Sequence, residues 1–167
     1  MESEFFVFTL VLAILLCALV SGLLFGFAVV VMPGVAKLSD RDFLLAFKHM
    51  DGIIQGRQTA FMLVWVGSIV STVLMMVVGS LQLNGVALYW MWSAAGLYLL
   101  AVQGPTIRFN IPLNNAIQAL EMDVLRESDL AEARAQFEGP WNRWNRFRTA
   151  MAIVAVAALL ILRMLIP

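Results

Sequence analysis

Four long apolar runs alternate with two polar segments along the chain. The runs cover residues 5–32, 60–81, 86–102 and 150–166, and the only Asp, Glu, Lys or Arg in them is Arg163. A helix needs about 20 apolar residues to cross a hydrocarbon core of about 30 Å, and backbone inside lipid must satisfy its own hydrogen bonds. The pattern therefore predicts an all-α integral membrane protein, a four-helix bundle that forms a single domain over residues 1–167.

The polar segment 33–59 predicts an amphipathic helix. Met32-Pro33-Gly34 is expected to stop the first helix, and Ser39 to cap the next one, because a serine hydroxyl accepts a bond from a free backbone N–H. Apolar residues then recur at helical spacing, namely Phe43, Phe47, Met50 and Ile54. A polar stripe has the same spacing, namely Lys48, Asp51, Gln55 and Gln58. We expect this helix at the membrane interface or under the bundle, with its polar stripe solvated or facing a site.

The polar segment 103–149 predicts further helices outside the membrane. Gly104 and the two prolines that follow it are expected to kink or end the third helix, because proline lacks the N–H that a helix uses. A polar helix comes next. Ser128 or Asp129 is a candidate cap for another helix, and Gly139-Pro140 restarts the chain as a helix that leads into the fourth run.

Small residues recur along one face of the first apolar run. Ala18, Gly22 and Gly26 have four-residue spacing, which lets membrane helices approach closely. This predicts a tightly packed bundle. The same face is also compatible with homodimerisation, so a homo-oligomer stays open as an alternative.

Composition supports a membrane protein, and the distribution of charge predicts its orientation in the membrane. Of 167 residues, 62% are hydrophobic and the mean hydropathy is +0.88, while 11 basic and 11 acidic residues give no net charge. Ten of the 11 Lys and Arg residues fall in the segments 33–59 and 103–149, so the positive-inside rule places both in the cytoplasm and both termini outside. The acidic start, Met1-Glu2-Ser3-Glu4, is unlike a cleavable signal peptide. No basic stripe points to nucleic acid, and the lone Cys17 has no internal disulfide partner.

Four residues just before the last apolar run fall on one helical face. Trp141, Trp144, Asn145 and Arg148 are spaced i, i+3, i+4 and i+7. If this face points inward, it presents two indoles, an amide and a guanidinium to a cavity. The alternative is interfacial anchoring, because Trp gathers at membrane interfaces and Arg flanks cytoplasmic helix ends.

Two further groups are candidates for chemistry. Asn110 and Asn114 flank Pro112, and they either bind a ligand at the cytoplasmic mouth or satisfy carbonyls freed by the proline. His49 is the only histidine, so no typical metal site is expected. It is either a solvated side chain or a proton carrier near neutral pH.

Three motifs together resemble the anthrone oxygenase-like family of small membrane proteins, which includes a large bacterial set of unknown function. They are Gly22 with Met32-Pro33-Gly34, Asn110-x-Pro112-Leu113-Asn114, and Trp141-x-x-Trp144-Asn145-x-x-Arg148-Thr149. The resemblance covers nearly the whole chain. It implies a four-helix membrane bundle and, in the fungal members, oxidation of a polyketide anthrone to an anthraquinone by molecular oxygen without metal or flavin. It also marks candidate site residues, namely Asn110, Asn114, Trp144, Asn145 and Arg148. The chain departs from the pattern at Lys48 and Asp51, where the family often has Gln and Asn.

The residues fit the chemistry of a cofactor-independent oxygenase. An anthrone carries an acidic C–H, and His49 or Asp51 could remove that proton. Arg148 and the asparagines could stabilise the enolate that forms, while Trp141 and Trp144 could stack on a flat substrate.

The sequence therefore predicts a bacterial inner-membrane protein that binds a planar hydrophobic small molecule and oxidises it with O2, with no metal or cofactor. The alternative is a non-enzymatic membrane subunit or assembly factor, in which the same motifs only brace the bundle. Transport is disfavoured, because the spans lack the charges that commonly mark ion paths.

Overall fold

The computed structural model describes residues 4–166, so the first three residues of the acidic start lie outside it. The described chain is all-helical. Its elements, in chain order, are α1 (Glu4–Gly26), η1 (Phe27–Val31), α2 (Met32–Val35), α3 (Asp40–Gln55), α4 (Thr59–Ser80), α5 (Gly85–Gly96), η2 (Leu97–Gln103), η3 (Thr106–Asn110), α6 (Ile111–Gln118) and α7 (Glu127–Leu165). The η elements are π turns within longer helices.

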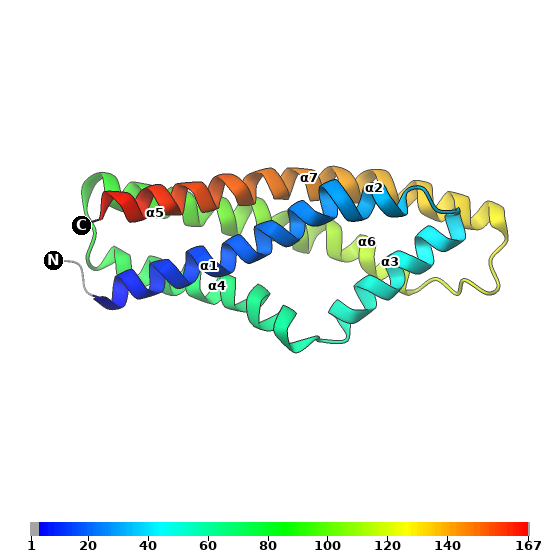
Figure 1. Ribbon diagram of the computed structural model, residues 1–167, viewed down its shortest axis with the longest axis horizontal. Helices are drawn as coiled ribbons and strands as arrows, with labels where there is room; N and C mark the ends of the chain where they lie inside the picture. The colour runs from blue at the N-terminus through cyan, green and yellow to red at the C-terminus, as the bar shows by residue number, and fades with distance from the viewer. Residues whose placement is uncertain (1–3, 167) are drawn as a thin grey trace.

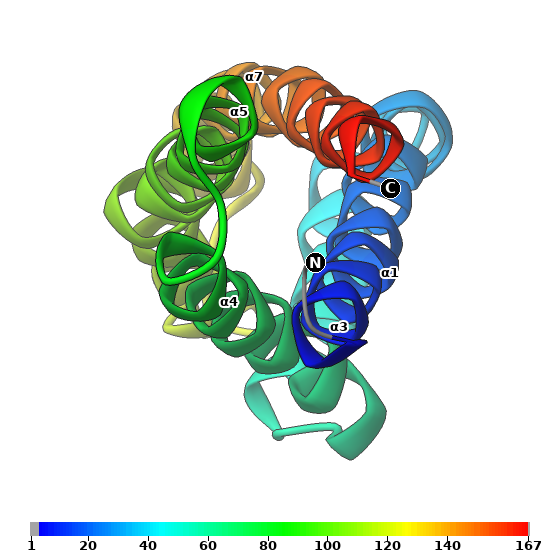
Figure 2. The same cartoon turned by 90° about the vertical axis from the view of Figure 1, so that its left-hand side faces the viewer.

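The four expected spans are confirmed as four long helices. These are α1–α2, α4, α5–α6 and α7, each long and apolar enough to cross a membrane. Seen from the end that holds the turn between α4 and α5, they surround a common axis (Figure 2). The start of α1 and the end of α7 lie at this end, while α3 and α6 lie at the other (Figure 1). The protein is an integral membrane four-helix bundle.

The helices run well beyond the apolar stretches. The 39 residues of α7 span about 58 Å at 1.5 Å per residue, roughly twice the thickness of a hydrocarbon core. The expected cap at Ser128 or Asp129 is wrong, because Arg126 is the N-cap residue and the Asp129 carboxylate accepts from its backbone N–H. The expected restart at Gly139-Pro140 is also wrong, since α7 continues through Pro140.

Three prolines produce π turns rather than helix ends. Met32, Gly104 and Ile111 each precede a proline, and each donates its N–H to the carbonyl five residues back. A proline cannot donate to the carbonyl four residues back and clashes with it, and the wider turn accommodates both effects. The first helix therefore continues to Val35, and the third continues past Gly104 to Gln118.

The helix expected in segment 33–59 is confirmed as α3. The hydroxyl of Ser39 caps it by accepting from the N–H of Asp42 (3.2 Å). Its apolar face is buried at Phe43, Leu44 and Phe47. This face packs on α6 and the first half of α7, so α3 covers the end of the bundle away from the termini.

Two hydrophobic cores follow one another along the long axis of the molecule. The larger core joins α1, α4, α5 and α7 inside the spans and includes Phe6, Met91 and Tyr98. The smaller core joins α3, α6 and the first half of α7 and includes Phe43, Leu130 and Phe137. Polar side chains gather at the level between the two cores.

The small-residue face of the first helix does not pack within the bundle. Ala18 and Gly22 are exposed, and a Cβ added at Gly22 or Gly26 meets nothing within 4 Å. The close approach expected there is wrong for this chain, because α1 turns its other face to α4 and α7. Close packing occurs at other small residues, including Ala95, Ala152 and Ala155, which are fully buried.

Candidate functional site

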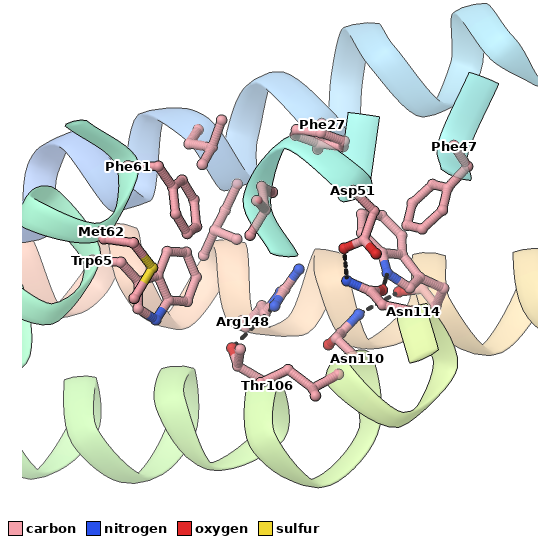
Figure 3. A pocket seen from close by; sticks show the side chains of 15 residues that line it. Phe27, Phe47, Asp51, Phe61, Met62, Trp65, Thr106, Asn110, Asn114 and Arg148 are labelled. Carbon is pink, nitrogen blue, oxygen red and sulfur yellow. Dashed lines mark hydrogen bonds between the residues drawn. The ribbon is translucent and has the colours of Figure 1, made fainter. Parts of the chain in front are cut away.

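A pocket of about 260 Å³ lies at the level between the two cores. Its walls come from the first helix, α3, α4, the η3–α6 stretch and α7 (Figure 3). The volume is slightly below the range of about 300–1,000 Å³ that is typical for drug-sized ligands. It therefore suits a compact small molecule.

Aromatic side chains form two sides of the pocket. On one side the Trp141 ring meets Phe47 edge-on, with centroids 5.4 Å apart, and Phe27 at 5.9 Å. On the other side Phe61 and Trp65 of α4 stack at 5.4 Å with an angle of 22° between their planes. Walls of this kind favour a flat apolar ligand, which buries both faces against rings.

Arg148 is a buried cation that faces the pocket. Its Nε and Nη2 donate to Oδ1 of Asn145 (3.2 and 3.0 Å), and its Nη1 donates to Oγ1 of Thr106 (3.0 Å). These bonds use three of the five N–H groups of a guanidinium. No carboxylate lies within ion-pair distance of Arg148 among residues 4–166, although buried charges are usually paired. The pocket therefore carries a positive charge with free donors.

Asp51 of α3 is the carboxylate in the pocket wall. It is 3% exposed and accepts bonds from Nδ2 of Asn114 (2.7 Å) and from Nε2 of Gln118 and Gln55 (2.8 Å each). Asn114 is itself held by the indole N–H of Trp141, which donates to its Oδ1 (2.8 Å). The bonds join α3, α6 and α7 and fix the carboxylate, and they leave one acceptor position on its Oδ1.

Asn110 contributes an unpartnered acceptor. Its Oδ1 is buried and has no hydrogen-bond donor among the described residues, while its Nδ2 donates to the carbonyl of Trp141 (3.4 Å). Turning the amide over would set its oxygen against that carbonyl, so the orientation is determined. A buried polar atom without a partner is costly, and a ligand O–H at this position would satisfy it.

The structure brings five of the eight sequence-predicted site residues to this pocket, namely Asp51, Asn110, Asn114, Trp141 and Arg148. Asn145 lies directly behind them, because its Nδ2 donates to the carbonyl of Leu24 and its Oδ1 holds Arg148. Trp144 lies outside the pocket and stacks on Phe109, with ring centroids 3.8 Å apart. His49 is exposed and borders a shallow groove beside Lys48 and Glu121 on the outer side of α3.

Several pocket residues carry no signal that the sequence analysis used. Phe27, Phe61, Trp65 and Thr106 lie within or beside apolar runs, where a side chain that faces a cavity has the same pattern as one that faces lipid. The i, i+4 spacing of Phe61 and Trp65 is the one clue, since it places two rings on one face. Among residues 4–166, no group of three or more His, Cys, Asp or Glu side chains gathers where it could hold a metal ion.

A comparison with known protein families matches residues 52–158 to the anthrone oxygenase family. The chain belongs to this family. No curated protein and no solved structure matches it. The matched region of this anthrone oxygenase family member holds the pocket walls from α4, η3, α6 and α7, whereas Asp51 and the walls from the first helix lie before it.

Proposed function

We propose that the protein binds a planar hydrophobic ketone in the pocket and oxidises it with molecular oxygen, as in the conversion of an anthrone to an anthraquinone. The observation that carries this proposal is the buried Arg148, which has free N–H donors and no carboxylate partner. A cation of this kind suits a ligand whose oxygen becomes negative during the reaction, since preorganised donors stabilise developing charge.

The remaining pocket residues fit the same ligand. The aromatic walls cover a flat ring system, and the free Oδ1 of Asn110 accepts from a phenolic O–H. Asp51 is the base of choice because it lies in the pocket wall, whereas His49 lies outside it. The proposal therefore places an anthrone with its ketone oxygen at Arg148 and its methylene carbon toward Asp51.

The reaction balances with one O2 per substrate. Asp51 takes a proton from the methylene carbon, and the negative charge moves to the ketone oxygen beside Arg148. The electron-rich carbon reduces O2 and forms a C–O bond, which gives a hydroperoxide after it takes up the proton. Loss of the second C–H proton then cleaves the O–O bond, so that one oxygen atom stays as the new ketone and the other leaves as water.

The test is oxygen uptake by the purified protein in lipid nanodiscs with dithranol, a dihydroxyanthrone. Oxygen consumed and quinone formed are expected in equal amounts, above the spontaneous rate without protein. Arg148→Gln is expected to lower the rate about 100-fold or more, as loss of an oxyanion donor does. Arg146→Gln is the matched control, because Arg146 is exposed, two residues away, and outside the pocket.

A folded Arg148→Gln variant with the rate of the unaltered protein would overturn the proposal, as would uptake no faster than the spontaneous reaction. A second readout separates binding from turnover. Danthron, the corresponding anthraquinone, is expected to bind the unaltered protein and to bind the Arg148→Gln variant weakly. Binding without oxidation would favour a non-enzymatic role, in which the pocket only holds the ligand.

A further inference from the structure

The pocket is closed on the side that faces α3, toward that end of the bundle. Four hydrogen bonds from side-chain amides join α3 to α6 there. Asn114 and Gln118 donate to Asp51, Gln118 also donates to the carbonyl of Lys48 (2.9 Å), and Gln55 donates to Oδ1 of Asn115 (3.1 Å). The smaller core lies directly beyond these bonds. A ligand that came from water at this end would have to break several of these bonds.

The opposite side of the pocket has no such closure. There α4 packs on α1 and α5, while α6 packs on α3 and α7, and α4 diverges from α6 toward α3 (Figures 1 and 2). The pocket residues along this gap are apolar, namely Phe61, Met62 and Trp65 from α4 and Ile111 from α6. No hydrogen bond between side chains joins α4 to α6 within the described part of the chain, and Ile111 is 43% exposed.

This gap lies at the depth of the membrane interface. Phe61 is the third residue of α4, which begins at Thr59, and the apolar run continues from there into the span. Arg57, which is exposed, lies in the turn just before α4, on the polar side of the gap. Aromatic and basic residues gather where hydrocarbon meets headgroups. The apolar rim therefore faces the part of the lipid chains that is nearest to the headgroups.

We propose that ligands reach the pocket sideways from the bilayer, through the gap between α4 and α6 whose rim is Phe61, Met62, Trp65 and Ile111. The proposal rests on the proposed function in that the pocket holds a ligand. It narrows the substrate class to flat molecules that dissolve in the outer part of a membrane leaflet. Water-soluble conjugates of the same ring system, such as glycosides, are excluded by the apolar rim.

The test measures how fast a membrane-soluble reagent reaches a thiol inside the pocket. Thr106→Cys places that thiol in the pocket wall, and N-phenylmaleimide, a small flat reagent, is added to the protein in nanodiscs. Labelling is followed by intact mass, and the native Cys17 is fully buried. Adding Ile111→Trp fills the rim and is expected to slow labelling about tenfold or more.

Two matched variants distinguish the route through the gap from a route on the α3 side. Ile107 lies one turn earlier on the same helix and outside the pocket, so Ile107→Trp is expected to change the labelling rate by no more than about twofold. Asn115→Ala breaks the bond to Gln55 on the α3 side, and the labelling rate is again expected to stay unchanged. Ile54→Cys is a second pocket thiol, in case Thr106→Cys does not fold.

Equal rates in the Ile111→Trp and Ile107→Trp proteins would overturn the lateral route. Faster labelling in Asn115→Ala would also overturn it, because it would place the route on the α3 side. Danthron separates this proposal from the proposed function. If it protects the thiol but the rim variant has no effect, the pocket binds the ligand and the route is wrong. If the rim variant slows labelling but danthron gives no protection, the route stands and the proposed ligand is wrong.

Discussion

Trp141 and Trp144 are three residues apart on α7 and have different surroundings. The Trp141 ring lines the pocket and its indole N–H holds Asn114, whereas Trp144 stacks on Phe109 outside it. Helical geometry explains the difference, because three residues at 100° each turn Trp144 about 60° away from Trp141, toward η3. Trp141, Asn145 and Arg148 share a narrower face, so the spacing predicted three of the four members of that group correctly as neighbours.

At this scale we predict that the two indoles differ in their effect on binding. Trp141→Phe keeps a ring in the wall but loses the bond to Asn114, so danthron affinity is expected to fall about fivefold, for a bond worth about 1 kcal/mol. Trp144→Phe is expected to leave affinity unchanged and to lower only thermal stability. Calorimetric titration of both variants in detergent measures this. A larger loss of affinity in Trp144→Phe would contradict the geometry of the pocket.

The same helical geometry explains why the sequence alone did not decide between His49 and Asp51 as the catalytic base. His49 and Asp51 are two residues apart, so they point to nearly opposite sides of α3. The stripe that contains Asp51 predicts which residues share its side, and Gln55 does contact it. Which side faces the pocket depends on where α6 and α7 lie. A single sequence does not encode that directly, because both sides of the helix carry polar residues.

At the scale of elements, Arg134 holds the turn between α2 and α3 against α7. Its guanidinium donates to the carbonyls of Ala36 (2.8 Å) and Leu38 (3.0 Å) and pairs with Asp40 and Glu138. Arg134→Gln is expected to lower the free energy of unfolding by about 2–3 kcal/mol, because hydrogen bonds to a charged group are strong. Thermal unfolding in detergent measures the loss.

Arg126→Gln is the control for Arg134, since Arg126 is exposed and its ion pair with Asp129 lies on the surface. Exposed pairs contribute little, so this variant is expected to unfold like the unaltered protein. A larger loss at Arg126 than at Arg134 would contradict the role assigned to the partly buried guanidinium of Arg134.

Gly79 of α4 packs closely against side chains of α1 and α5. An added Cβ would overlap the Met91 side chain and would lie 2.7 Å from the Phe6 ring. Gly79→Ala is therefore expected to destabilise the bundle by about 1–3 kcal/mol through overpacking. Gly22→Ala is the matched control in the membrane, because its Cβ meets nothing within 4 Å. A stable Gly79→Ala protein in the same unfolding assay would contradict this packing.

The helix ends show what an apolar pattern can and cannot predict. The runs gave the four spans, because the cost of charge in lipid limits where charged residues occur. They did not give the lengths of the helices, because α3, α6 and the first half of α7 pack on one another beyond the spans. Tertiary packing of this kind supports helix through Pro140. The π turn before Pro105 lets the third helix continue past Gly104, where local rules predict a kink or an end.

At the scale of the whole molecule, the turn at residues 36–39 and the loop at 119–126 lie at one end, and the turn at 81–84 lies at the other (Figure 1). Charge bias predicts that the first end lies in the cytoplasm. Lys37→Cys and Asp123→Cys are therefore expected to react with a membrane-impermeant thiol reagent only in inside-out vesicles.

Asn84→Cys is the opposite marker and is expected to react only in right-side-out vesicles. The native Cys17 is buried and serves as the silent background. If labelling places Lys37 and Asp123 on different sides of the membrane, the four-helix bundle is contradicted. If it places both on the outer side, the bundle stands and the predicted orientation is reversed.

The π turns before Pro33, Pro105 and Pro112 have a consequence for the history of the chain. A π turn holds one residue more than the α turn it replaces, so each one is equivalent to a single inserted residue. A relative without Pro112 is therefore expected to lack one residue between positions 106 and 110 as well. Its alignment with this chain would show a one-residue gap there, while the helix faces on both sides of the gap keep their register.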